Sequence, residues 1–341
     1  MKKRIIAICM TAFMALSLFA GCGGSNKDNK ESSSSLSTKS EKTNDASTTQ
    51  EKKVDASEKL TIAFVPKTLN NPFFVAIKDA IQAGCDAKGW TLKCNAADAE
   101  TEVDKQVSIV EAFIQEGVDA IILGPSDRTS LIDTINNAAK KNIPVFLVDS
   151  GSDPADFVSF VGTDNYIGGK EGAKWVGENV KSGQVAILDG YAGNDATTQR
   201  YQGFMDEIAN YPDIEVVDSQ YGNCEIAQGM SVTENFLTAY PDLTCVFAVN
   251  DMMAIGAGQA VQAADKRDQI TICGFDGQPD AAQAIIDGTI DATIAQKPAT
   301  MGTTIVGQIE KYFAGEEISE TTDTGCDVVT IDNAKTYLEW Q

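Results

Sequence analysis

LTIAFVPKTLNNPFF, at residues 60–74, is the stretch that decides the fold. Its first six residues form an apolar run rich in strand formers, and a polar loop between two prolines follows. An amphipathic helix is predicted to begin at Pro72. In an open α/β sheet, a loop that joins a buried strand to a helix lies at the carboxyl edge, where such sheets bind small ligands. This loop carries one ammonium, two amides and two adjacent aromatic rings, which suit a small hydroxyl-rich ligand better than bond-breaking chemistry.

The same alternation of apolar runs and helical patterns continues along the chain. The predicted strands begin at Thr61, Thr91, Asp119, Ile143, Phe157, Gln184, Ile214, Cys245, Ile270 and Ala292. These runs lack polar alternation, as expected for parallel strands covered on both faces. They predict βαβ units and an α/β fold of two doubly wound parallel-sheet lobes, because ten strands are many for one such sheet. The run FVSFVGTDN, at residues 157–165, resembles a crossing from one lobe to the other.

The N-terminal residues predict export. Three cations precede an apolar run of signal-peptide length, too short and too soon followed by small residues to be a good membrane span. FAGC resembles a bacterial lipobox and predicts a lipoprotein signal peptide at residues 1–22 with Cys22 lipidated. An ordinary secretory signal with an incidental cysteine is the alternative. Residues 23–59 are polar, and we expect a disordered tether that places the protein at the outer face of the cell membrane or the periplasmic side.

The composition excludes several classes of function. The net charge of −22 argues against nucleic acid as a partner, because phosphates require a basic face. The chain contains no histidine, which removes Ser-His-Asp and Cys-His catalysis and histidine-ligated zinc. Neither a complete P-loop nor a GxSxG motif is present. An enzyme that uses only carboxylates or lysine remains open at this point.

The cysteines show neither a CxxC pair nor a zinc spacing. Cys94, Cys245 and Cys273 lie inside apolar strand-like runs, which predicts buried small hydrophobic side chains. Disulfides are the alternative in an exported protein, and Cys85 with Cys94 is the first pair to check. The sequence does not decide the state of Cys85, Cys94, Cys224, Cys245, Cys273 or Cys326.

Polar side chains stand where the predicted strands end or in the segments that follow. They are Asp149, Tyr191, Arg200, Asn250, Asp276 and Gln296. Carboxylates accept hydroxyl hydrogen bonds, amides donate and accept, and a guanidinium donates in a planar fork, so the set matches vicinal hydroxyls. The rings of Phe73, Phe74 and Tyr191 can cover the C–H face of a sugar. Each residue alone is equally explained as a helix cap, a turn or core, and only their joint placement favours a binding site.

Several motifs, in order along the chain, resemble the ribose-binding protein family, the type I periplasmic solute-binding proteins of sugar ABC importers. They are LNNPFF at Leu69, VGTDN at Val161, GGK at Gly168, FAVND at Phe247, GFDGQPD at Gly274 and ATIAQ at Ala292. The resemblance covers residues 60–315 and implies a monosaccharide, pentose or hexose, captured between two lobes and delivered to a membrane permease. We expect a monomer with one lobe at residues 60–163 plus 297–325 and the other at residues 164–296 plus 326–341. The family also implies hinge strands near residues 163–165, 296–298 and 324–327.

The resemblance also implies particular sugar contacts. These are Asn71, Phe73, Phe74, Asp149, Arg200, Asn250, Asp276 and Gln296, with Tyr191 at a position where the ribose binder has an aliphatic contact. Lys67 replaces a serine and resembles the sugar-donating lysine of arabinose-type binders. Ser150 replaces an arginine, Gly124 an asparagine and Cys224 an aromatic ring, so we expect a retuned monosaccharide site and leave open whether the sugar is ribose. The calcium loop of glucose/galactose binders has no counterpart, so no metal and no cofactor are expected.

Two other functions fit parts of this pattern. A sensory protein that reports sugar to a membrane kinase or chemoreceptor would have the same fold and pocket. An enzyme could use Asp149 and Asp276 as paired carboxylates on a glycosidic bond. The substrate-binding protein of an importer is the favoured interpretation, and we expect the protein not to be an enzyme.

Overall fold

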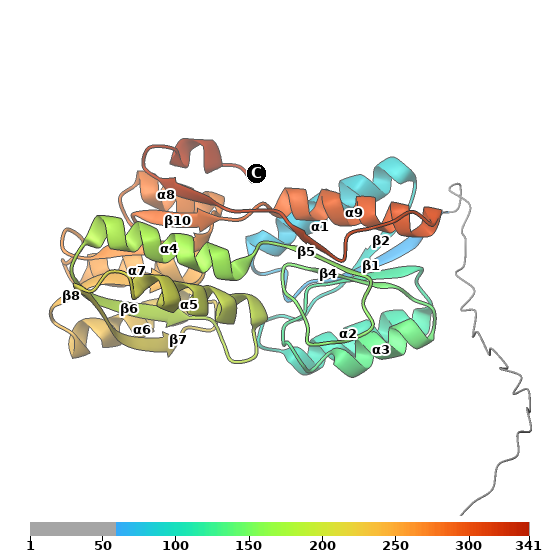
Figure 1. Cartoon of the computed structure of the whole chain (residues 1–341), viewed down its shortest axis with the longest axis horizontal. Coiled ribbons are helices and arrows are strands. Elements are labelled where there is room, and N and C mark those ends of the chain that lie inside the picture. Colours follow the sequence, from blue (N-terminus) through green and yellow to red (C-terminus); the bar gives the residue numbers. More distant parts are fainter. Residues whose placement is uncertain (1–58, 341) are drawn as a thin grey trace, which may run out of the picture. The chain divides into compact units, whose positions relative to one another are not determined.

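The structure is a computed structural model that describes residues 59–340. The predicted signal peptide, Cys22 and the tether up to residue 58 lie outside the described residues. Residues 59–340 form two six-stranded sheets, each covered by helices (Figure 1). Within the same range, no helix has both the length and the apolar character needed to cross a membrane.

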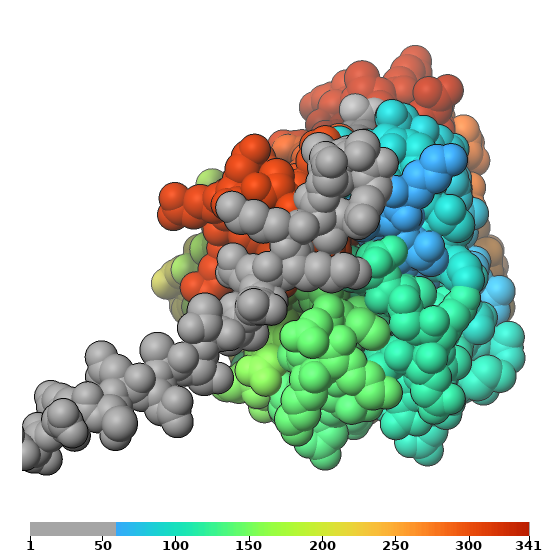
Figure 2. All heavy atoms as spheres, turned by 90° about the vertical axis from the view of Figure 1, so that its right-hand side faces the viewer, coloured from blue at the N-terminus to red at the C-terminus, as the bar shows by residue number. Residues whose placement is uncertain are grey.

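The first sheet is entirely parallel. In spatial order its strands are β11 (Thr321–Asp323), β5 (Ser159–Gly162), β4 (Val145–Val148), β3 (Ala120–Leu123), β1 (Thr61–Val65) and β2 (Thr91–Cys94). Its helices are α1 (Pro72–Lys88), α2 (Val103–Glu116), α3 (Ile132–Lys140) and α9 (Pro298–Ala314). This sheet and its helices form the first lobe. Figure 2 views the molecule from that end and shows orange-red atoms from late in the sequence beside the blue and green of its first part.

Side chains of β1 explain why helices cover both faces of this sheet. Successive residues of a strand point to opposite faces. Ile62 and Phe64 pack with α1 and α9, whereas Ala63 and Val65 pack with α2 and α3. The four positions from Ile62 to Val65 are therefore all apolar, which gives the unbroken run in the sequence.

The second sheet has one antiparallel strand at its edge. In spatial order its strands are β12 (Asp327–Thr330), β10 (Ala292–Ala295), β9 (Thr271–Asp276), β8 (Leu243–Ala248), β6 (Gly183–Asp189) and β7 (Ile214–Tyr221). Strand β12 runs antiparallel to β10, and the remaining pairs are parallel. Its helices are α4 (Asn165–Val180), α5 (Asp195–Ile208), α6 (Ile226–Ala239), α7 (Asp251–Ala263) and α8 (Pro279–Ile286), with a short 3₁₀ helix at Ala334–Tyr337. This sheet and its helices form the second lobe.

All ten predicted strands are present, and the predicted α/β class with two sheets is confirmed. Strands β11 and β12 were not predicted, because they are short, partly exposed and carry polar residues such as Thr321 and Asp327. The chain passes between the sheets after β5, after β10 and between β11 and β12. Three short segments thus connect the two lobes.

The C-terminal segment contacts the first lobe. The ring of Trp340 meets that of Phe73 edge to face, with centroids 6.0 Å apart. Just before it, the 3₁₀ helix packs on α8 of the second lobe. Residues that were predicted to belong to the second lobe therefore touch both lobes.

All six cysteines within the described residues are free, so Cys85 and Cys94 form no disulfide in this structure. Cys245 and Cys273 are buried as predicted, and Cys94 is half-buried. Burial raises the pKa of Cys85 to about 11. At neutral pH this side chain is therefore a thiol.

Candidate functional site

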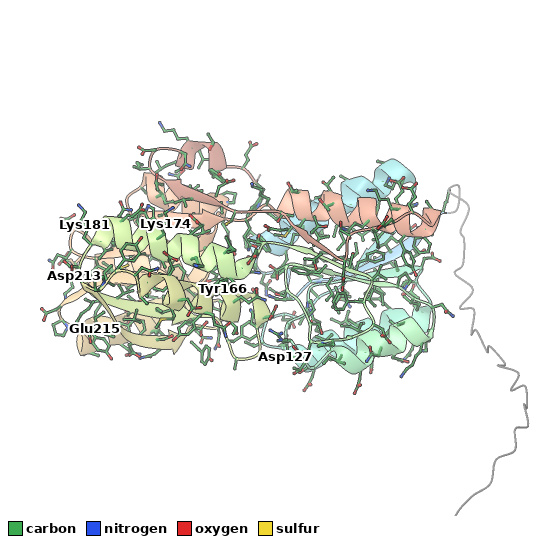
Figure 3. All side chains as sticks on the ribbon, viewed as in Figure 1. Asp127, Tyr166, Lys174, Lys181, Asp213 and Glu215 are labelled. Atoms are coloured by element: carbon green, nitrogen blue, oxygen red, sulfur yellow. The ribbon has the colours of Figure 1, made fainter. Side chains whose placement is uncertain are left out.

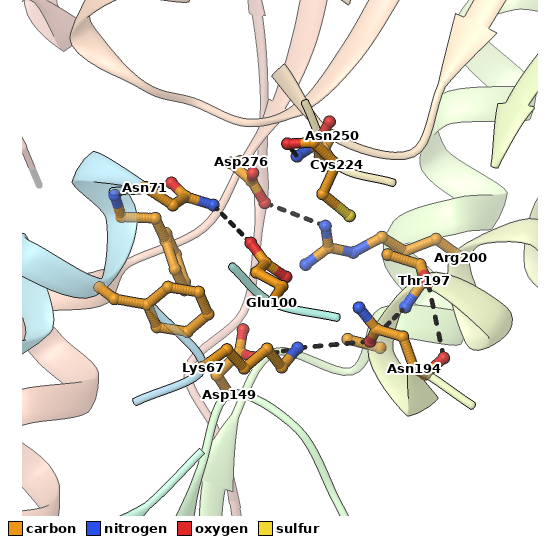
Figure 4. A pocket seen from close by; sticks show the side chains of 13 residues that line it. Lys67, Asn71, Glu100, Asp149, Asn194, Thr197, Arg200, Cys224, Asn250 and Asp276 are labelled. Carbon is orange, nitrogen blue, oxygen red and sulfur yellow. Dashed lines mark hydrogen bonds and ion pairs between the residues drawn. The ribbon is translucent and has the colours of Figure 1, made fainter. Parts of the chain in front are cut away.

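A small cavity lies where the strand ends of both sheets meet (Figure 4). The lining residues are Lys67, Asn71, Phe73, Phe74, Glu100 and Asp149 from the first lobe, and Asn194, Ala196, Thr197, Arg200, Cys224, Asn250 and Asp276 from the second. Every predicted site residue except Tyr191 and Gln296 lines this cavity.

The loop from β1 to α1 places the first-lobe side chains. Asn71 caps α1 by accepting a hydrogen bond at Oδ1 from the backbone N–H of Phe73, at 3.1 Å. Pro72 begins the helix, where its missing N–H costs nothing. The rings of Phe73 and Phe74 then meet edge to face with centroids 5.4 Å apart. Capping and aromatic packing thus fix this wall of the cavity.

Lys67 and Asp149 form a buried ion pair on the same wall, with Nζ and Oδ2 3.0 Å apart. Nζ also donates to Oδ1 of Asn194 in the second lobe, at 3.3 Å, and lies 5.7 Å from the centroid of Phe74. Burial alone would lower the pKa of Lys67, but the nearby Asp149 and Glu100 carboxylates outweigh it and raise that pKa. Lys67 is therefore a fixed cation that touches both lobes.

Arg200 provides the corresponding cation in the second lobe. Its Nε donates to Asn165 Oδ1 at 2.8 Å, and Nη1 donates to the Val249 carbonyl at 2.8 Å and to Asp276 Oδ1 at 3.0 Å. The guanidinium carbon lies 3.8 Å from the ring centroid of Phe275. Nη2 has no hydrogen-bond partner among the described residues, and Figure 4 shows it directed into the cavity. The guanidinium is held on one side and free to donate on the other.

Gln296 acts on the cavity through Asp276 rather than by lining it. Its Nε2 donates to Asp276 Oδ1 at 2.8 Å. Burial raises the pKa of Asp276, although Arg200 and Gln296 counter part of this effect. Oε1 of Gln296 is buried without a partner among the described residues. We interpret Gln296 as a residue that positions the Asp276 carboxylate.

Three lining residues have backbone conformations that side chains rarely adopt. Asp149 has φ of 68°, Cys224 of 60° and Asp276 of 124°. Such positions cost about 1–3 kcal/mol each and persist where the surrounding structure fixes them. Asp149 directly follows β4, Asp276 is the last residue of β9, and Cys224 lies in the loop after β7. All three line the cavity. The strained backbone turns these side chains into the space between the lobes.

Tyr191 and its neighbours connect the lobes directly instead of lining the cavity. The Tyr191 hydroxyl donates to the Ser126 carbonyl in the first lobe, at 3.0 Å. Arg128 Nη1 lies 2.7 Å from Asp195 Oδ1 at the start of α5. Asp127, labelled in Figure 3, lies in the same first-lobe loop. We call these contacts the rim contacts; they stabilise the arrangement in which the lobes meet.

Replacing Tyr191 with phenylalanine is expected to weaken ligand binding about 2- to 10-fold, because one buried hydrogen bond of about 0.5–1.5 kcal/mol is lost from the closed arrangement. Calorimetry gives the affinity, and small-angle scattering of the unliganded protein should show a more open average shape. Tyr221→Phe is the control, because that side chain is 55% exposed. Equal affinity and equal scattering for Tyr191→Phe and the wild type would show that the rim contacts do not stabilise closure.

Sequence reasoning missed Glu100, Asn194, Ala196 and Thr197 as lining residues. Glu100 lies in an acidic stretch that resembles a solvated loop, and no local signal marks it. Asn194 carries the signal of a helix cap, which it is: its Oδ1 accepts from the Thr197 N–H at 3.4 Å. Its Nδ2 is buried without a partner among the described residues. The sequence signal that could have identified Asn194 is its position as the cap of α5, between the predicted site residues Tyr191 and Arg200.

The cavity is built for binding rather than for bond breaking. Its carboxylates are acceptors, its two cations are donors, and its amides are both, which matches a ligand whose hydroxyls donate and accept. Asp149 and Asp276 each form an ion pair with a cation of their own lobe. Within the described residues, no group of acidic or cysteine side chains is arranged to hold a metal ion.

A polar cavity supplied by the strand ends of two facing doubly wound sheets defines a two-lobed solute-binding protein. The chain belongs to the family described as "Periplasmic binding protein domain", whose model matches residues 62–317. The predicted family is thereby confirmed.

Particular relatives support the same assignment. The chain is similar to the ribose import binding protein of Escherichia coli (strain K12), with 36% identity over 265 residues, 77% of this chain and 88% of that protein. A periplasmic solute-binding protein of an ABC transporter from Actinobacillus succinogenes, solved with D-allose, has a TM-score of 0.78 and 34% identity, covering 82% of this chain and all of that one. A carbohydrate transporter solute-binding protein from Agrobacterium radiobacter, in complex with D-arabinose, has a TM-score of 0.79 and 28% identity, covering 82% and 99%. These relatives are binding proteins, which confirms the prediction that the chain is not an enzyme.

Proposed function

We propose that the protein captures one monosaccharide between its lobes and delivers it to the permease of an ABC importer. The observation that carries this proposal is the pairing of an acid with a cation on each wall of one cavity, Lys67 with Asp149 and Arg200 with Asp276. Each pair offers both acceptors and donors to vicinal hydroxyls. A single sugar that contacts both walls therefore bridges the lobes.

The ligand class follows from the site chemistry and the relatives together. Relatives bind ribose by name, and D-allose or D-arabinose in solved structures. The cavity is small and is lined from both lobes, which favours a single pentose or hexose over an oligosaccharide. Phe73 and Phe74 supply an apolar wall for the C–H face of the ring.

We assign residues 60–163 plus 297–325 to one lobe and residues 164–296 plus 326–341 to the other, with the three connecting segments as the hinge. A ligand shifts the equilibrium between open and closed forms only by its differential affinity for them. A sugar held by both walls binds the closed form more tightly. The permease then recognises that form.

The same proposal includes attachment of the protein to a membrane. Cys22 would carry the lipid and would be the first residue left once the residues before it are removed, and residues 23–59 would link the anchor to the folded lobes. We propose a monomer at the outer face of the cell membrane or the periplasmic side. Labelling of cells with a fatty-acid analogue should modify the wild type and not Cys22→Ser.

A thermal-shift screen of monosaccharides tests the binding function. We expect at least one of D-ribose, D-allose and D-arabinose, at millimolar concentration, to raise the Tm of the protein. A ligand that binds only the folded state stabilises that state by mass action. The sugar recovered after prolonged incubation should be chemically unchanged. A panel of aldoses and ketoses that leaves the Tm unmoved would reject the proposal.

A further inference from the structure

Glu100 is the acid of the cavity that forms no ion pair within the described residues. Its side chain is buried, and Figure 4 shows its carboxylate in the middle of the cavity. Oε1 accepts a hydrogen bond from Asn71 Nδ2 at 3.1 Å. Oε2 has no hydrogen-bond partner among the described residues. Glu100 therefore presents one acceptor oxygen to whatever occupies the cavity.

The two cations of the cavity are already engaged by other acids. Lys67 Nζ lies 3.0 Å from Asp149, and Arg200 Nη1 lies 3.0 Å from Asp276. A buried carboxylate that no cation neutralises is costly unless donors satisfy it. Burial raises the pKa of Glu100, although Lys67 and the Asn71 hydrogen bond counter this. Donors from a bound ligand would remove much of that cost.

The loop that carries Glu100 is fixed in place. Glu102 Oε2 accepts the backbone N–H of Asp98 at 2.9 Å. The Asp98 carbonyl accepts hydrogen bonds from Asn70 Nδ2, at 2.6 Å, and from Thr68 Oγ1, at 3.2 Å. The loop after β2 is thus tied to the loop after β1, beside Asn71. This tie delivers the Glu100 carboxylate to the cavity in a defined position.

We propose that Glu100 is a specificity-determining residue whose free carboxylate oxygen accepts a hydrogen bond from one particular hydroxyl of the bound sugar. This inference rests on the proposed sugar-binding function. A site built to bond a hydroxyl discriminates strongly against the analogue that lacks it, because its own polar group is then left unpaired. Glu100 therefore selects sugars that carry this particular hydroxyl.

A merely structural role for Glu100 would be to hold Asn71. Asn71 has other constraints, since its Oδ1 accepts from the Phe73 N–H at 3.1 Å and from Gln278 Nε2 at 3.3 Å. Removing Glu100 would in that case lower affinity for all sugars alike. Direct contact instead predicts a loss tied to one hydroxyl, and this difference decides between the two roles.

The test is a thermodynamic cycle in which the Glu100 side chain and one sugar hydroxyl are removed separately and together. Calorimetry measures the affinity of each combination. The sugar among D-ribose, D-allose and D-arabinose with the largest thermal shift, and its monodeoxy analogues, are titrated into wild type, Glu100→Ala and Glu100→Gln. Glu100→Ala should weaken binding of the parent sugar about 10- to 100-fold. For the deoxy analogue that lacks the hydroxyl bonded to Glu100, Glu100→Ala and the wild type should have nearly equal affinities. Glu100→Gln keeps the size of the side chain. Its affinity for the parent sugar should lie between those of Glu100→Ala and the wild type.

Two controls keep the outcome interpretable. Glu111→Ala removes the same charge from an exposed site on α2 and should bind like the wild type. Circular dichroism shows whether each variant is folded. Parent-sugar affinity within twofold of wild type in Glu100→Ala, or equal losses for every deoxy analogue, would overturn the inference. Failure of every sugar to bind the wild type would instead reject the proposed function.

Discussion

Replacing Arg200 with alanine is expected to weaken sugar binding by roughly 100- to 4,000-fold, which corresponds to about 3–5 kcal/mol. The variant removes the donors of the second wall and leaves the buried Asp276 carboxylate without its cation. Asn165 and the Val249 carbonyl also lose their hydrogen bonds. Calorimetry with the sugar that gives the largest thermal shift measures the loss.

Two further variants sharpen this prediction. Arg200→Lys keeps the charge but loses the planar fork, so we expect it to remain at least about 10-fold weaker than wild type. Arg267→Ala is the matched control, because Arg267 pairs with Asp291 outside the cavity. Wild-type affinity in a folded Arg200→Ala protein would show that the guanidinium does not contact the sugar.

Replacing Gly203 with alanine is expected to lower the stability of the protein by about 3 kcal/mol, at the upper end for overpacking, and the Tm by roughly 6–12 °C. A Cβ at Gly203 would overlap the carbonyl oxygen of Tyr166, where α5 crosses α4. A Cβ at Gly169, on α4, would likewise overlap the Arg200 carbonyl. Backbone atoms can yield only if the helices separate, so the cost exceeds the roughly 1 kcal/mol that alanine gains over glycine in a helix.

This close helix contact also positions Arg200, which lies one turn before Gly203 on α5. Gly203→Ala should therefore weaken sugar binding as well as folding, and thermal denaturation with calorimetry measures both. Gly307→Ala on α9 is the control, because a Cβ there would meet no atom within 4 Å. We expect that variant to be equally or slightly more stable than wild type. Equal stability of Gly203→Ala and Gly307→Ala would contradict the argument.

Local signals in the sequence were sufficient for most of the fold. Parallel strands buried on both faces are unbroken apolar runs, so β1 and β4 could be recognised from composition alone. The carboxyl ends of such strands gather at one edge, which is why Asp149 and Asp276 could be predicted to converge. Strand β11 is a partly exposed polar edge, and nothing in its three residues distinguishes it from a loop.

What the sequence did not reveal depends on contacts between distant segments. Glu100 reaches the cavity only because its loop is bonded to the loop after β1, about thirty residues away. Tyr191 is an aromatic residue after a strand, as a sugar platform would be, yet its hydroxyl bonds to Ser126 across the lobes. Gln296 directly follows a strand, but it donates a hydrogen bond to Asp276 and does not line the cavity. Side-chain direction at these positions is set by tertiary packing and not by local pattern.

The most direct test of the central claim, that two facing sheet edges form one sugar site, is isothermal titration calorimetry of the protein with D-ribose, D-allose and D-arabinose. We predict that at least one of them binds with one sugar per chain, and that Asp149→Ala on one lobe and Asp276→Ala on the other each abolish that heat. Saturable binding that survives both substitutions, or no binding heat with any of the three sugars, would contradict the account.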